Sequence, residues 1–213
     1  MKIVILAVSK KKGGWCVVGK NVENLKQWVR LVGDKSGREL YDREIMINDG
    51  KKTRLIETQD IVDVELGAPC PLLEQPENTL YKKLDYIKRL DNIGEMYLDS
   101  EDIIFGNVGE YLDADGKAKS RSVLLIKVSN LKIEYNEPLA EGEKPRTFAW
   151  FTFNGVDYER LRVTDPYCRK TESIGNAFLC VSLGPAFNFC KNGTKAWPID
   201  RHYKFVAAVY RFL

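Results

Sequence analysis

Histidine is almost absent from this chain, with His202 as the only one among 213 residues. The five cysteines are widely spaced and form no CxxC pair; they are Cys16, Cys70, Cys168, Cys180 and Cys190. A structural zinc site draws on closely spaced pairs of such ligands, so the sequence predicts no metal site. We interpret the cysteines as reduced, mostly buried thiols.

Catalytic and targeting signatures are missing as well. The patterns GxSxG, HxE and the P-loop do not occur, although residues 33–37 carry P-loop residue types at the wrong spacing. No stretch approaches the roughly 20 apolar residues of a membrane span, and the apolar run after Lys2 is too short for a signal peptide. The sequence therefore predicts a cytoplasmic protein that contains no membrane span and needs no cofactor.

The charge of the chain is unevenly distributed, although the net charge is only +3. Residues 1–54 contain thirteen Lys and Arg against six Asp and Glu, and residues 121–213 contain fourteen against nine. Residues 55–120 reverse this balance, with six basic and fifteen acidic residues. Basic ends around an acidic middle suit a surface that binds a polyanion, and ordinary surface scatter is the alternative.

The first 32 residues predict three β-strands in a meander. Residues 3–8 and 15–18 are short apolar runs rich in β-branched side chains. Gly13 and Gly14 between them allow the positive φ of a hairpin turn. Residues 28–32 alternate, so that Trp28 and Arg30 share one face of a third strand.

Residues 78–91 predict the one helix of the chain. Leu80, Leu84 and Ile87 have the i, i+4, i+7 spacing of a helix face, and Asn78 is a suitable N-cap. Elsewhere, many short strands at regular spacing indicate a sandwich or barrel. We predict a mainly β protein of two small barrels, the first with the helix in residues 1–95 and the second in residues 96–213, which begins with an acidic linker.

Two groups of short motifs resemble a known family. The first group is KIVILAVSK at 2–10, GGWCVVG at 13–19, WVR at 28–30 and QPEN at 75–78. The second is LRVTDP at 161–166, VSLG at 181–184 and YKFVAA at 203–208. Their order resembles that of the bacterial dual OB-containing domain proteins, which carry two OB-type barrels in one chain. The resemblance implies a binding role without an established set of catalytic residues, and some members are thought to lie among prokaryotic defence genes.

OB barrels bind single strands by combining a basic groove with aromatic side chains on which bases stack. In the first barrel the candidates are basic and aromatic residues of the meander: Lys10, Lys11, Lys12, Trp15, Lys20, Trp28 and Arg30. The alternative is that the lysines form a solvated turn and the tryptophans belong to the core.

In the second barrel, alternation places Arg160 and Arg162 on one face of a strand. We predict that Phe151 and Phe153 lie across from them on the partner strand, and that Trp150 lies on its other face. The two arginines and two phenylalanines would form a second stacking groove. The alternative is a solvated outer face of the barrel.

We therefore predict a non-enzymatic protein that binds single-stranded or structured RNA or DNA as an accessory of a larger system, such as a prokaryotic antiviral defence system. One alternative is a protein-interaction module that docks an effector through the acidic segment 95–115. Another is a metal-dependent nuclease that uses carboxylates of this segment, such as Asp99 and Asp102.

Overall fold

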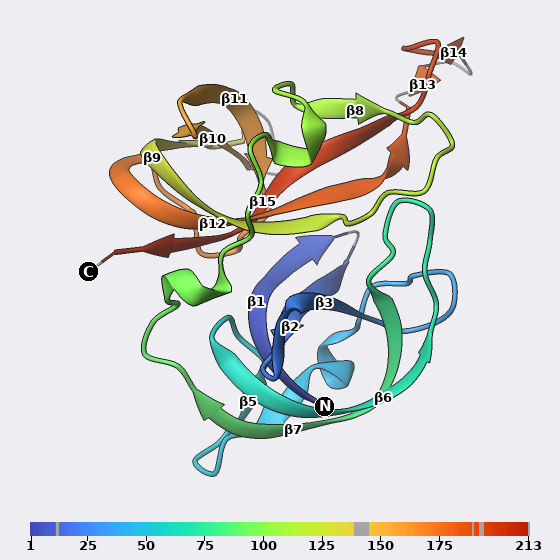
Figure 1. The fold of residues 1–213 in the computed structure, drawn as a ribbon, viewed down its shortest axis with the longest axis vertical. Coiled ribbons are helices and arrows are strands. Elements are labelled where there is room, and N and C mark those ends of the chain that lie inside the picture. The colour runs from blue at the N-terminus through green and yellow to red at the C-terminus, as the bar shows by residue number, and fades with distance from the viewer. Residues whose placement is uncertain (12, 139–144, 189, 192–193, 213) are drawn as a thin grey trace.

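The computed structural model describes every residue except 12, 139–144, 189, 192–193 and 213, and it contains two β-barrels (Figure 1). The first barrel is closed, with the strand order β1-β2-β3-β7-β6. Its strands are β1 (Lys2–Lys11), β2 (Gly14–Asn21), β3 (Asn24–Val32), β6 (Asp60–Pro69) and β7 (Asn78–Arg89). Every neighbouring pair is antiparallel except the parallel pair β3–β7.

The second barrel repeats this arrangement. Its strands are β9 (Val123–Asn136), β10 (Arg146–Phe153), β11 (Val156–Val163), β12 (Glu172–Phe187) and β15 (Arg201–Arg211). A parallel pairing of β11 with β15 closes the barrel, and the short strand β8 (Tyr111–Asp113) pairs with the start of β15. Five strands of which only the third and fifth are parallel, twice in one chain, confirm the prediction of two OB-like barrels.

The remaining elements are short. They are the hairpins β4 (Met46–Asn48) with β5 (Thr53–Leu55) and β13 (Cys190–Lys191) with β14 (Thr194–Lys195), and the 3-10 turns η1 (Asp42–Glu44), η2 (Glu95–Tyr97) and η3 (Ile104–Gly106). The predicted domain boundary at residue 95 falls in the connection between β7 and β9.

The prediction of a helix at 78–91 is wrong, because most of this segment forms strand β7. Leu84 and Tyr86, two residues apart, pack together against the core of the first barrel, whereas Ile87 is 41% exposed. Asn78 caps no helix; it pairs with Arg30 at the start of the parallel ladder. The described residues contain no α-helix, and hence no helix long and apolar enough to cross a membrane.

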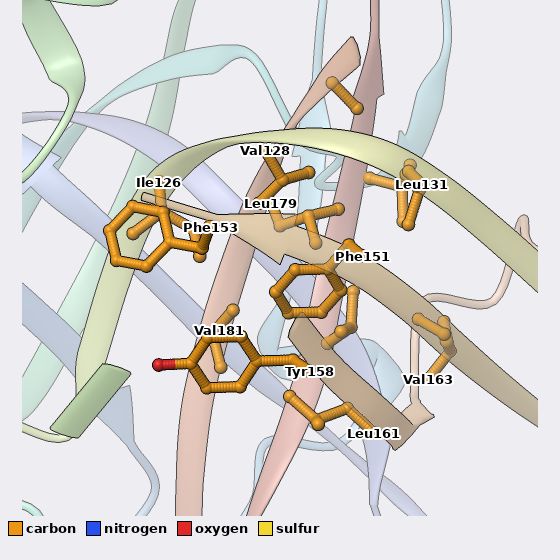
Figure 2. Packing of buried hydrophobic residues seen from close by; sticks show 14 of the residues in the cluster. Ile126, Val128, Leu131, Phe151, Phe153, Tyr158, Leu161, Val163, Leu179 and Val181 are labelled. Carbon is orange, nitrogen blue, oxygen red and sulfur yellow. The ribbon is translucent and has the colours of Figure 1, made fainter. Parts of the chain in front are cut away.

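Three hydrophobic clusters hold the molecule together. One fills the first barrel, and another fills the second, where Phe151, Phe153 and Tyr158 pack among aliphatic side chains (Figure 2). The third lies between the barrels and joins residues of β1, such as Leu6, to residues of β9, β12 and β15, such as Phe178. The outer face of the first barrel is therefore packed directly against the outer face of the second.

Candidate nucleic-acid interface

In OB barrels, the outer face of the second and third strands is the usual surface for oligonucleotides. In the first barrel that face belongs to β2 and β3, and it carries Lys20, Trp28 and Arg30. Their exposed fractions are only 1%, 8% and 2%, because the second barrel covers this face. The structure corrects the prediction that these three side chains lie on an open binding surface, and it shows them joining the two barrels.

Asp99, in the connection between the barrels, is the centre of one buried contact. Lys20 Nζ donates to Asp99 Oδ1 at 2.8 Å and to the Tyr97 carbonyl oxygen at 2.7 Å. Trp28 Nε1 also donates to the Asp99 carboxylate, and the Leu125 backbone N–H of the second barrel donates to its Oδ2 at 2.8 Å. Burial lowers the pKa of Lys20, and the hydrogen bond that Lys20 donates to Asp99 partly offsets this shift. Asp99 thus links β2, β3 and β9.

The contacts of Asp99 also bear on the nuclease alternative. Both of its carboxylate oxygens accept hydrogen bonds from protein groups, and its side chain is 7% exposed. Within the described part of the chain, no three His, Cys, Asp or Glu residues are grouped so that they could hold a metal ion. The observed role of Asp99 is structural.

Arg30 makes a second contact across the junction. Its Nη2 donates to Ser122 Oγ at 2.9 Å and to Ser182 Oγ at 3.2 Å, and both serines belong to the second half of the chain. Nη1 lies against Cys16 Sγ, while the buried Nε has no hydrogen-bond partner. The Ser122 hydroxyl donates in turn to Glu77 Oε2 at 2.7 Å. Arg30 is therefore held mainly by neutral groups.

Trp15 and the lysines of the β1–β2 hairpin are partly occupied by neighbours. Trp15 belongs to the first core, and its Nε1 donates to Asp42 Oδ1 at 2.6 Å. Lys10 Nζ lies 3.8 Å from the centroid of the Trp15 ring, and Lys11 Nζ lies 3.0 Å from Glu39 Oε1. Lys12 lies outside the described residues. Lys10 is the most exposed of the described candidates in this barrel, with 52% of its side chain accessible.

In the second barrel, the two phenylalanines predicted to share a face with Arg160 and Arg162 lie on the opposite face of β10. Phe151 and Phe153 point into the barrel and are 3% and 5% exposed, so they cannot stack on a base (Figure 2). Phe148 is the residue that lies opposite Arg162 in the β10–β11 register. A register shift next to Phe151 places two residues of β11 across from one of β10, and Arg160 there has a φ of 55°. The prediction missed this bulge.

The observed outer surface of β10 and β11 combines aromatic rings with positive charge. The guanidinium carbons of Arg160 and Arg162 lie 5.1 and 5.8 Å from the centroid of the Phe148 ring. The Trp150 ring meets the Phe148 ring edge-on, with centroids 6.4 Å apart. Burial lowers the pKa of Arg162, and repulsion by Arg146 lowers it further. We refer to these five residues as the β10–β11 face.

The arginines of the β10–β11 face form no ion pair with the described part of the chain, although Glu134 lies opposite Phe148 in the β9–β10 register. Among the described residues, no carboxylate lies within ion-pair distance of Arg146, Arg160 or Arg162. Lys132, which pairs with Trp150 across β9 and β10, is also exposed. Strict alternation from Arg146 to Trp150 was the sequence signal that could have identified the aromatic members of this face.

Comparison with known proteins agrees with this architecture. A family model described as the dual OB-containing domain matches residues 1–209. No curated protein and no solved structure matches the chain significantly. Since the match covers nearly the whole chain and both barrels have the expected strand order, the chain belongs to the dual OB-containing domain family.

Proposed function

We propose that this protein binds single-stranded nucleic acid on the β10–β11 face of its second barrel. The observation that carries the proposal is the Phe148 ring, which has two arginine guanidinium groups within 6 Å of its centroid, neither of them with an acidic partner among the described residues. The position of this face on the second and third strands of an OB barrel supports it further. In the first barrel the corresponding face is buried, so one open face is available per chain.

The chemistry of the face suits a flexible strand. Phe148 and Trp150 can each stack on a base, and a base–aromatic stack contributes about 1–3 kcal/mol. Arg146, Arg160 and Arg162 can contact phosphates, and a guanidinium forms two hydrogen bonds with a phosphate in a fixed geometry. Stacking does not depend on base identity, so we expect weak sequence preference.

Fluorescence anisotropy with a labelled single strand of twelve nucleotides tests the proposal. If Lys132 and the three arginines contact four phosphates, affinity should fall about 50-fold between 50 and 200 mM salt. Phe148→Ala and the double variant Arg160→Ala/Arg162→Ala should each weaken binding at least about fivefold.

The matched control is Lys26→Ala/Lys88→Ala, which removes two exposed positive charges from the first barrel and leaves the β10–β11 face intact. This control should bind almost as well as the wild type. Equal weakening by the control and by the arginine variant would show that only net charge matters, and the absence of binding at low salt would refute the proposal.

The acidic segment 95–115 has fewer carboxylates free to bind a basic protein partner than its composition suggests. Four of its carboxylates form ion pairs with basic residues of the same chain; they are Glu95, Asp99, Glu101 and Asp115. The role as an accessory of a larger or antiviral system stays a prediction. Nucleic-acid binding at the β10–β11 face is the function that the geometry supports best.

A further inference from the structure

A cavity of about 240 Å³ lies at the junction of the two barrels, outside the β10–β11 face. The first barrel contributes Lys10, Lys11 and Arg30 to its lining. The second barrel contributes Phe187, Tyr203 and Phe205. Both barrels must be docked for this site to exist, because neither set of residues closes the cavity alone.

The charged side chains described in the lining of the cavity all carry positive charge. Among the described residues, its lining includes three cationic side chains and no aspartate or glutamate. Lys10 and Lys11 have acidic neighbours in Asp42 and Glu39, but these two residues lie outside the lining. The lining cation without an acidic partner among the described residues is therefore Arg30, and its charge favours a negatively charged ligand.

Arg30 gives the strongest indication of an anion. Its side chain is 2% exposed, and no carboxylate of the described residues lies within 4.0 Å of its guanidinium. Its hydrogen-bond acceptors are Ser122, Ser182 and Cys16, and its Nε has no acceptor at all. A buried charge is usually paired, because taking a cation out of water without a counter-charge is unfavourable. A bound anion would supply that counter-charge.

The other wall of the cavity is aromatic. Phe187 is 51% exposed, which is unusual for a large apolar side chain, and Tyr203 and Phe205 are partly exposed. Aromatic rings of this kind offer a flat surface on which a nucleobase can stack. The volume of the cavity is just below the range of about 300–1,000 Å³ that is typical of ligand pockets. The cavity therefore suits one nucleotide unit and not a longer chain.

We propose that the cavity between the barrels binds a single phosphorylated nucleotide unit, with the phosphate near Arg30, Lys10 and Lys11 and the base against Phe187. The unit could be a free mononucleotide or the phosphorylated end of a strand. Phe205 pairs with Arg162 in the parallel β11–β15 register, so the cavity adjoins the β10–β11 face. The strand-end form rests on the proposed function, whereas the free-nucleotide form does not.

Isothermal titration of the full chain with four small probes tests the proposal. The probes are AMP, UMP, adenosine and inorganic phosphate. We expect both mononucleotides to bind and adenosine to bind at least tenfold more weakly, because it lacks the phosphate. Undetectable binding of both mononucleotides at millimolar concentration would overturn the proposal, and so would equal binding of adenosine and AMP.

Three variants test the assignment of residues. Phe187→Ala and Lys10→Ala/Lys11→Ala change partly exposed side chains and should weaken AMP binding about tenfold each. Arg30→Lys keeps the charge but loses the planar group, and it should weaken binding as well. Tyr167→Ala, which removes a 67% exposed ring outside the cavity, is the control and should leave binding unchanged. Wild-type affinity in both Phe187→Ala and the lysine variant would refute the site.

Oligonucleotides with and without a terminal phosphate distinguish this proposal from the proposed function. Cavity variants should lose the preference for a phosphorylated end but still bind the body of the strand. Variants of the β10–β11 face should lose strand binding and still bind AMP. If the wild type shows no preference for either phosphorylated end, the strand-end form is refuted and the AMP titration decides the other form.

Discussion

Asp99→Ala removes a carboxylate that links both barrels at a buried position. In the variant, the Lys20 ammonium would stay 1% exposed and without its carboxylate, and the Trp28 Nε1–H and Leu125 N–H groups would lose their acceptor. Removing one partner of a buried ion pair costs about 3–5 kcal/mol. That loss is a large share of a typical unfolding free energy of about 5–15 kcal/mol.

Urea unfolding, followed by tryptophan fluorescence, measures this effect. With an m-value of about 2–3 kcal/mol/M, the midpoint should fall by about 1–2.5 M urea. Glu95→Ala is the matched control, because the Glu95–Lys127 pair is exposed and should contribute at most about 1 kcal/mol.

A second substitution separates the unpaired charge from the lost hydrogen bonds. In Lys20→Met/Asp99→Ala no buried ammonium remains at position 20, so this double variant should be more stable than Asp99→Ala alone. If Asp99→Ala matches the Glu95→Ala control, or if the double variant is no more stable than the single one, the junction does not depend on this ion pair.

Three further predictions concern other parts of the molecule. The log–log salt slope of strand binding should become smaller by about 1.4 in Arg160→Ala/Arg162→Ala, measured by anisotropy, because two phosphate contacts are lost. Burial lowers the pKa of Lys204 to about 8, below its unfolded value of about 10.4. The unfolded chain therefore binds more protons between these values, and stability should rise with pH across that window by about 2–3 kcal/mol more in the wild type than in Lys204→Met, measured by urea unfolding at pH 7.5 and 10. Gly19→Ala should lower the melting temperature strongly, since its Cβ would lie 2.1 Å from the Val4 carbonyl oxygen of the paired strand.

The barrels themselves were predictable from local signals. Asn154 and Gly155 form the turn between β10 and β11, with φ values of 49° and 79°, as the Asn-Gly pair predicts. Alternation also correctly predicted that Trp28 and Arg30 lie on one face of β3, and that Val29 and Leu31 lie on the other. The helix prediction was wrong because Leu80, Leu84 and Ile87 match a helical period by chance. Pairing with β6 and β3 determines the structure of this segment.

The candidate site was harder to predict, because exposure depends on the other barrel. Trp28 and Arg30 look like members of an open face, and nothing near them in the sequence shows that residues 99, 122 and 182 cover them. Other parts of the sequence did indicate that the two barrels pack together. Residues 3–8 and 123–126 are apolar without alternation, as expected of strands that are buried on both faces. Such strands need a second packing partner outside their own barrel.

The polar groups at the junction explain why two barrels of the same topology have different surfaces. An interface of apolar residues alone tolerates sliding, whereas Lys20, Arg30 and Asp99 each need particular partners and thereby fix one relative orientation. In that orientation the outer face of β2 and β3 in the first barrel is buried, and residues of this barrel form one wall of the cavity. Because Phe205 adjoins Arg162, the same orientation places the cavity beside the open face of the second barrel. Loss of the junction should therefore impair the two proposed sites unequally, abolishing the cavity while leaving the β10–β11 face in place.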